Sequence, residues 1–175
     1  MTREVTLRPI DLLCRATAAE KGDALPGDAD IADPVGVTDH SIDLAAPPCA
    51  IGQWLIQMGG DRAGGYSYDR LDNASCRSAR TILPEFQPVC VGTLFLAMPV
   101  ATDCFILVDF EPERFLLLGG PGDAVPEGEP GSEAWRAAFN RANWIFRLTP
   151  VDGGRRLHAR SRLAFLQLGR RRTLR

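Results

Sequence analysis

Histidine, lysine and long apolar runs are scarce in this sequence of 175 residues. His40 and His158 are far apart, and neither has a second metal ligand at helical or strand spacing. No apolar run approaches the about 18 residues of a membrane-spanning helix. The first residues, Met1 to Glu4, lack the apolar stretch of a signal peptide. We therefore expect no metal site, no cofactor, no stable membrane insertion and a cytoplasmic location.

The cysteines and the charge exclude further classes. The five cysteines are odd in number, widely spaced and without a Cys-x-x-Cys pair, so they indicate reduced thiols rather than a disulfide framework or a zinc knuckle. The net charge of −2 and the pI near 5.7 offer no attractive field to nucleic acid. Lys21 is the single lysine among 20 basic residues, which indicates a GC-rich bacterial genome rather than a function.

Composition predicts one folded domain, because 45% hydrophobic and 24% charged residues are ordinary globular values. Residues 1–39 combine a weakly amphipathic stretch with a Gly/Pro/Asp-rich segment, which we interpret as an N-terminal arm. The domain itself is expected over 40–168, and the arginine-rich residues 169–175 are expected to form a basic tail.

The apolar periodicity predicts an α+β fold. A short strand, 41–44, precedes a helix that begins after Pro47-Pro48 and carries a core-facing stripe of Ile51, Trp54, Leu55 and Met58. A second short helix is expected over 66–73. Alternation then predicts strands over 89–97, 104–110, 114–118, 144–149 and 157–165. The last of these is expected to turn His158, Arg160 and Arg162 to a wet face.

Several motifs resemble those of the START-like, polyketide-cyclase-like superfamily that is often labelled SRPBCC. The resemblance covers about residues 22 to 163, and the matching segments are 25–28, 54–59, 62–69, 71–73, 82–87, 91–92, 144–148, 152–154 and 160–162. The subfamily that it indicates has no assigned reaction.

The resemblance implies a helix-grip fold. In this fold a curved antiparallel sheet wraps a long C-terminal helix and leaves a cavity for hydrophobic ligands, and two short helices follow the first strand. Some relatives carry lipids and others cyclise polyketides. Gly65 stands where relatives commonly have tryptophan, and the sequence ends at Arg175, soon after the last strand. We therefore expect the long closing helix to be missing. The stretch around Ile10 to Leu13, or a second copy of the chain in a homodimer, would then cover the cavity.

Ten residues are the candidate ligand-binding set. The walls of the cavity are expected to contain four aromatic residues, Trp54, Phe105, Trp144 and Phe146. Its mouth is expected to be surrounded by Arg62, Tyr66, Tyr68, Glu85 and Gln87. His158 joins this set as a general base if the sheet curls so that its polar side faces the cavity. Alternatively, an Arg–Glu pair and two satisfied tyrosines hold the turn together, and the histidine lies on the surface. No catalytic residue is assigned, because the sequence has neither a Gly-x-Ser-x-Gly elbow nor a phosphate-binding loop.

The sequence thus favours binding of a small or medium hydrophobic molecule or lipid between sheet and helices. The first alternative is an enzyme resembling a polyketide cyclase or dehydratase, and the second is a dimerising interaction module without a cavity. Binding is preferred over catalysis, because an apolar cavity retains a guest without any group poised for proton transfer.

Overall fold

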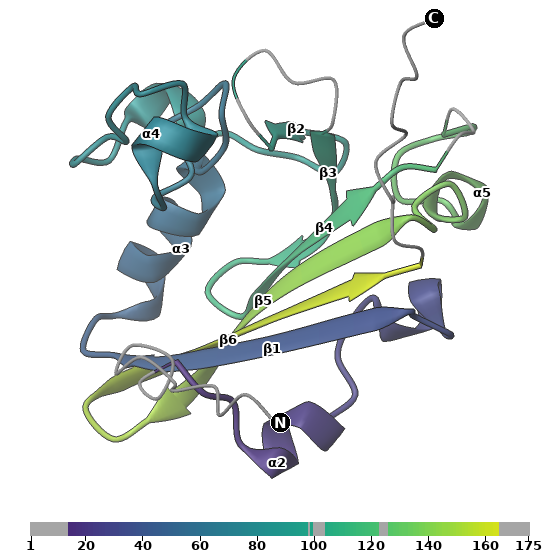
Figure 1. The fold of residues 1–175 in the computed structure, drawn as a ribbon, viewed down its shortest axis with the longest axis horizontal. Helices are drawn as coiled ribbons and strands as arrows, with labels where there is room; N and C mark the ends of the chain where they lie inside the picture. Colours follow the sequence, from purple (N-terminus) through teal and green to yellow (C-terminus); the bar gives the residue numbers. More distant parts are fainter. Residues whose placement is uncertain (1–13, 98, 100–103, 123–125, 165–175) are drawn as a thin grey trace, which may run out of the picture.

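The computed structural model of the protein describes residues 14–97, 99, 104–122 and 126–164. One antiparallel sheet forms its centre, and its six strands lie in the order β1-β6-β5-β4-β3-β2 (Figure 1). The strands are β1 (Gly36–Leu44), β2 (Leu94–Leu96), β3 (Cys104–Glu111), β4 (Phe115–Gly120), β5 (Ala142–Val151) and β6 (Gly154–Leu163). The sheet is open, with β1 and β2 at its two edges.

Helices in the described residues are short. They are α2 (Ala18–Gly22), α3 (Pro48–Gln57), α4 (Asp69–Asp72) and α5 (Glu133–Arg136), with 3-10 turns η1 (Asp28–Ile31) and η2 (Pro84–Phe86). The expected α+β class, the antiparallel sheet and the two helices after the first strand are confirmed. No helix of the described residues is long and apolar enough to cross a membrane.

Two element boundaries differ from those expected. β1 begins at Gly36, so the expected border between arm and domain at 39/40 falls inside this strand. β2 is confined to Leu94–Leu96, because Cys90 and Thr93 close a tight turn around Gly92, whose φ is +96°. The stretch Ile10 to Leu13 and the basic tail 169–175 lie outside the described residues, and so does the place of a closing helix after 164.

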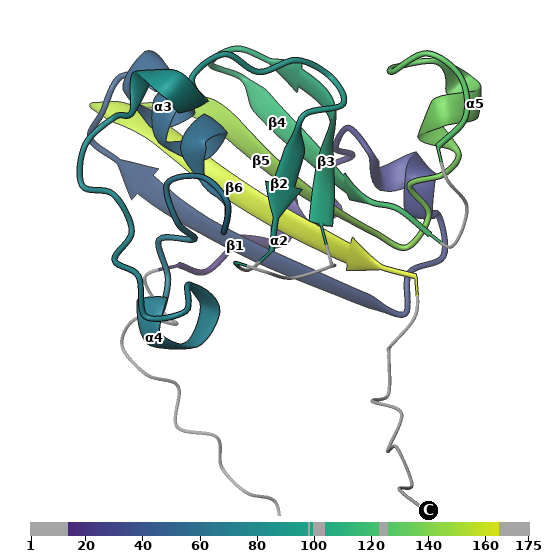
Figure 2. The same cartoon turned by 90° about the horizontal axis from the view of Figure 1, so that it is seen from above.

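Each face of the sheet has its own apolar core. The front face is the one that packs on Leu55 and Met58 of α3, and its buried residues are Phe95, Leu107, Leu116, Leu118 and Phe146. The back face packs on Leu25 and on the α5 region, and its core consists of Leu25, Val108, Leu117, Trp135, Phe139 and Ile145. Figures 1 and 2 show α3 and α2 on opposite sides of β1 and β6.

The prediction that the polar side of β6 faces solvent is wrong. His158 and Arg160 are only 3% and 2% exposed, because the chain before β1 folds back over this part of the back face. That segment anchors itself with Ala16, Leu25 and Ile31, which are buried. The described part of the expected arm is therefore a structural layer of the domain.

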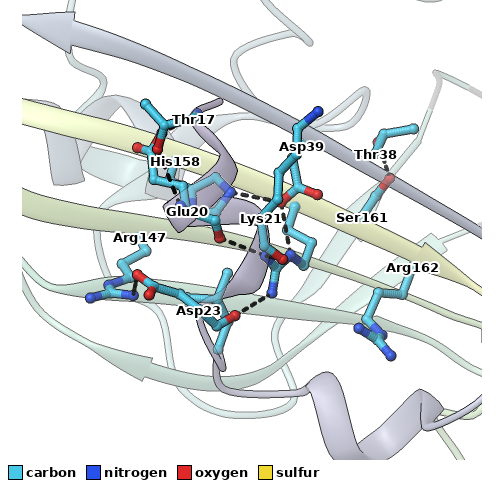
Figure 3. Close-up of polar contacts among 12 residues, drawn as sticks. Thr17, Glu20, Lys21, Asp23, Thr38, Asp39, Arg147, His158, Ser161 and Arg162 are labelled. Carbon is cyan, nitrogen blue, oxygen red and sulfur yellow. Dashed lines mark hydrogen bonds and ion pairs between the residues drawn. The ribbon is translucent and has the colours of Figure 1, made fainter. Parts of the chain in front are cut away.

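Arg160 holds this layer to the sheet. Its guanidinium forms ion pairs of 2.8 Å with Asp39 of β1 and Asp28 of η1. It also donates to the backbone oxygens of Glu20, Lys21 and Asp23 at 2.8–3.0 Å. His158 Nε2 shares Asp39 at 2.8 Å (Figure 3). A buried guanidinium with all its donors paired is compatible with a protein interior, whereas an unpaired one is not.

Removing this guanidinium is expected to destabilise the domain strongly. Arg160→Met leaves two carboxylates and three carbonyls without their donor, and breaking a buried pair costs about 3–5 kcal/mol. Urea-induced unfolding followed by circular dichroism measures the loss. The control is Arg114→Met, because Arg114 pairs with Glu111 on the surface with 71% of its side chain exposed and should lose at most about 1 kcal/mol. Equal losses in the two variants would contradict the anchoring role of Arg160.

The pKa of Glu20 gives this layer a pH dependence. The Arg156 guanidinium, at 3.1 Å between Nη2 and Oε2, and the hydrogen bonds of Thr17 hold the pKa of Glu20 well below its usual range. A lowered pKa in the folded state stabilises the fold above the unfolded value, about 4.3, and this contribution is lost as the pH falls below it.

Glu20→Gln should therefore flatten the dependence of the unfolding free energy on pH between about pH 5 and pH 3. Urea titrations at several pH values measure this slope. Glu113→Gln, in the exposed turn between β3 and β4, is the isosteric control and should keep the wild-type slope. An unchanged slope in Glu20→Gln would show that the carboxylate has no such linkage.

Candidate functional site

An open apolar groove of about 640 Å³ lies on the front face between α3 and strands β5 and β6. It is lined by residues from the end of β1, from α3, from the loop after α3 and from the two strands. They are Leu44, Ala45, Ala46, Ala50, Ile51, Trp54, Leu55, Met58, Gly65, Tyr66, Trp144, Phe146 and Leu157. Trp144 and Tyr66 remain 36% and 39% exposed, so the groove is accessible from solvent.

The local sequence explains why α3 forms one wall. Pro48 occupies the first turn of the helix, where its fixed φ and missing N–H are tolerated. The predicted stripe then turns Ile51, Leu55 and Met58 toward the sheet. Alanines 45, 46 and 50 leave the space beside the start of the helix unfilled, which keeps the groove open at that end.

Strand alternation explains the opposite wall. Trp144 and Phe146 alternate with Asn143 and Ile145, so both aromatic rings point to the front face, with centroids 4.6 Å apart. A smaller cavity of about 220 Å³ adjoins the groove, since Met58, Gly65 and Trp144 line both. Phe105 belongs to this second cavity. The expected aromatic walls therefore lie together.

Gln57 lies beside the groove and contacts one of its lining residues, Tyr66. This side chain at the end of α3 is fully buried. Its Oε1 accepts from the backbone N–H of Leu83 at 3.0 Å and from Gln87 Nε2 at 3.3 Å. Its Nε2 donates to the backbone oxygen of Thr81 at 3.2 Å and to the hydroxyl of Tyr66. One amide thus joins the helix to the two loops that follow it.

Tyr66 is fixed in the groove by its backbone as well. Its φ is +54°, which is unusual for an aromatic residue. Ser78 Oγ accepts from the Tyr66 N–H at 3.2 Å and donates to Asp69 at 2.6 Å, a bond that lowers the pKa of the Asp69 carboxyl. Gly64 packs so closely on Ser78 that a Cβ would meet its Oγ at 2.4 Å. The Tyr66 ring is held edge-on to Trp54, with centroids 5.4 Å apart.

Arg62 lies beside the smaller cavity rather than in the groove. Its guanidinium stands 5.0 and 5.1 Å from the ring centroids of Phe86 and Phe95, and it donates to the Phe86 carbonyl. Burial lowers the pKa of Arg62. The alternative of an Arg62–Glu85 ion pair is not realised among the described residues, because the two aromatic rings take up the guanidinium instead.

The structure brings together part of the predicted site. Trp54, Tyr66, Trp144 and Phe146 line the groove, and Phe105 lines the adjoining cavity. The other five candidates lie outside both linings: Gln87 bonds to Gln57, Arg62 donates to the Phe86 carbonyl of η2, which also contains Glu85, and Tyr68 and His158 lie elsewhere. Tyr68 is 73% exposed and outside both linings.

His158 is the clearest correction. It was expected on the surface or, with a curled sheet, as a base in the cavity, but it is buried on the back face against Asp39. Its neighbours on β6, Leu157 and Ala159, face the front, so the sheet separates its imidazole from the groove.

Sequence reasoning missed Gln57 and the strand residue Leu157 as parts of the site. Gln57 follows the stripe of α3, and nothing in a single glutamine indicates that it is a buried hub. Leu44 and Leu157 gave a weak signal, since each is an apolar residue on the predicted front side of its strand. Both residues reach the groove because β1 and β6 pair in register from Gly36 to Leu44.

The groove is chemically simple. Among its lining residues Tyr66 carries the only titratable side chain. No group of three or more His, Cys, Asp or Glu in the described residues could hold a metal ion. The arrangement can enclose an apolar surface and offer it the hydroxyl of one tyrosine and the indole N–H groups of Trp54 and Trp144.

Comparison with known proteins gives similarity in fold. No protein-family model matches the chain, and no curated protein matches it. The Aha1 dimer from Colwellia psychrerythraea is similar at 14% identity and a TM-score of 0.43, over 78% of this chain and 81% of that one. The polyketide-cyclase-like protein Cgl2372 from Corynebacterium glutamicum is similar at 16% identity and a TM-score of 0.38, over 73% and 64%.

Protein MLL2253 from Mesorhizobium loti is similar at 16% identity and a TM-score of 0.40, over 75% of this chain and 79% of that one. The sheet order given above, and not these distant similarities, establishes the fold class.

Gln57→Ala is expected to destabilise the protein by about 2–3 kcal/mol, because it removes a fully buried side chain and leaves half-buried partners such as the Leu83 N–H without this hydrogen bond. Thermal and urea unfolding measure this loss. Gln53→Ala is the matched control on the same helix, since the Gln53 side chain is exposed and its backbone oxygen, which accepts from Gln87, is retained. Its effect should stay within about 0.5 kcal/mol. Similar losses in both variants would contradict the role of Gln57 in joining α3 to the two loops that follow it.

Proposed function

We propose that this protein binds a small or medium apolar molecule, such as a lipid or another hydrophobic metabolite, in the groove between α3 and strands β5 and β6. The observation that carries the proposal is the composition of the groove wall. Ten of its residues have no side-chain nitrogen or oxygen, and the other three are Trp54, Tyr66 and Trp144. A concave, mostly apolar surface with a few polar groups is the usual form of a ligand site.

The size of the groove supports useful affinity. Each buried methylene contributes roughly 0.8 kcal/mol before the costs of association. A ten-carbon chain therefore gains at most about 8 kcal/mol, which alone corresponds to a Kd of about 1 μM, and the costs of immobilisation weaken this to between the micromolar and millimolar ranges. A partly exposed Trp144 gives up solvent contact at the same time, which adds to the apolar gain.

Catalysis receives less support than binding. A cyclase or dehydratase needs an acid or base beside the reacting atoms. His158, the candidate base, lies on the opposite face of the sheet. We therefore keep the enzyme as an alternative and assign no catalytic residue.

A cytoplasmic location and a homodimer belong to the same proposal. The five cysteines are free thiols, which suits a reducing compartment. A second copy of the chain is the alternative occupant of the groove, because Trp144, Ile42 and Leu163 leave apolar surface exposed on or beside the front face.

The positions of the three tryptophans allow a direct test. Trp54 and Trp144 line the groove, whereas Trp135 is 5% exposed in the core of the back face. Bromine quenches indole fluorescence at short range, so 11-bromoundecanoic acid should quench the delipidated protein and its Trp135→Phe variant. The double variant Trp54→Phe/Trp144→Phe should keep binding, measured by calorimetry, but lose the quenching.

Two outcomes would overturn this function. One is the absence of any saturable binding to a monomer, and the other is quenching that persists in the double variant. Sedimentation of the free protein at several concentrations shows whether a second copy of the chain occupies the groove instead. A dimer that dissociates when the fatty acid is added would indicate that ligand and second copy compete for one groove.

A further inference from the structure

The polar side-chain groups of the groove wall can all donate a hydrogen bond. Among the lining residues only Trp54, Trp144 and Tyr66 carry a side-chain nitrogen or oxygen. An indole nitrogen is a donor and never an acceptor. The tyrosine hydroxyl can do both, so its role depends on the hydrogen bond that it already makes. The direction of that bond decides what the groove offers to a ligand.

The backbone fixes this direction. The Leu83 N–H can only donate, so the atom of Gln57 that it meets at 3.0 Å must be the amide oxygen. The Thr81 carbonyl can only accept, so the atom of Gln57 beside it must be the amide nitrogen. The same nitrogen contacts Tyr66, and it can only donate. The Tyr66 hydroxyl oxygen is therefore the acceptor in this bond.

A hydroxyl that accepts from Gln57 keeps its own proton for another partner. In the part of the chain that the structure describes, the hydrogen bond that this hydroxyl makes is the one from Gln57. Gln57 is fully buried and Ser78 fixes the Tyr66 backbone, so the phenol is set in place before a ligand arrives. Such preorganisation lowers the entropic cost of binding.

Resting on the proposed function, we propose that Tyr66 is the polar anchor of the groove and that it selects uncharged apolar ligands bearing a hydrogen-bond acceptor, such as a ketone, aldehyde or ester carbonyl. Tyr66 donates its hydroxyl proton to this acceptor. The two indoles add donors and no acceptor. An amine or ammonium group finds no acceptor among the lining side chains except the Tyr66 oxygen, which Gln57 already engages.

Charge complements this selection. No lining residue of the groove is Asp, Glu, Lys, Arg or His, so an ionised head group inside it would be buried without a counter-ion. A neutral carbonyl costs much less to desolvate than a carboxylate or ammonium and is repaid by one hydrogen bond. A long carboxylic acid can still bind by its chain with the carboxylate left in water.

A matched pair of ligands tests the anchor. The probes are 2-acetylnaphthalene and 2-ethylnaphthalene, which differ by a carbonyl oxygen in place of two hydrogens. Calorimetric titration of the wild-type protein should show the ketone bound more tightly by roughly 3- to 10-fold after correction for their different hydrophobicity, the value of one neutral hydrogen bond. Tyr66→Phe should remove this preference, so that the two probes bind equally after the same correction.

Two controls make the result specific. Tyr68→Phe removes a hydroxyl from a neighbouring tyrosine outside the groove and should retain the preference. The infrared stretching band of the bound ketone should move to lower wavenumber in the wild-type protein, which reports the hydrogen bond without any substitution.

The outcomes separate this inference from the proposed function. Failure of both naphthalenes and of the brominated fatty acid to bind would overturn the proposed function and this inference together. Equal affinity for the two naphthalenes, with an unshifted carbonyl band, would overturn the anchor and leave apolar binding intact. A preference that survives Tyr66→Phe would also overturn it, and would assign the donor to an indole.

Discussion

A single buried guanidinium decides how the two faces of this sheet are used. Arg160 projects from β6 to the back face, where it binds Asp39 on the neighbouring strand and Asp28 and three carbonyls of the chain before β1. An unpaired charge at 2% exposure would be prohibitively costly, so the segment that supplies these partners must fold onto the sheet. These polar contacts hold the segment over β6 and β1, next to the apolar core around Leu25 and Trp135 that covers the rest of the back face.

Closing the back face in this way leaves α3 to cover the front. A ten-residue helix cannot span six strands, and the front core collects around Leu55 and Met58 over strands β2 to β5. Toward β6 and β1 the sheet is less covered, and the groove forms where the alanines beside the helix fail to reach Phe146 and Leu157. The opening of the groove thus follows from the shortness of α3 and the small residues at its start.

Periodicity predicted what depends on one residue and its neighbours. The helical stripe after Pro47-Pro48 and the alternation of Trp144 with Ile145 indicated which residues share the front face, because both patterns follow directly from backbone geometry. Burial of His158 and Arg160 could not be predicted in this way. Alternating polar residues normally mean a solvated face, and the acids that neutralise this one lie more than a hundred positions away in sequence. Gln57 eluded prediction for the same reason, because its partners belong to loops without any periodic pattern.

The chemistry of the groove follows from the difference between the two faces of the sheet. Arg156 and Arg160 of β6 are directed to the back, where they pair with Glu20, Asp28 and Asp39, and the sheet separates these charges from the groove. The front is left with aliphatic and aromatic walls and with donors that have no charge. Because water can enter an open groove, affinity there has to come from apolar area, and a fixed hydroxyl can add selectivity but little strength. Tyr66 is suited to that role, since Gln57 has already engaged its oxygen and only its proton remains to distinguish one apolar ligand from another.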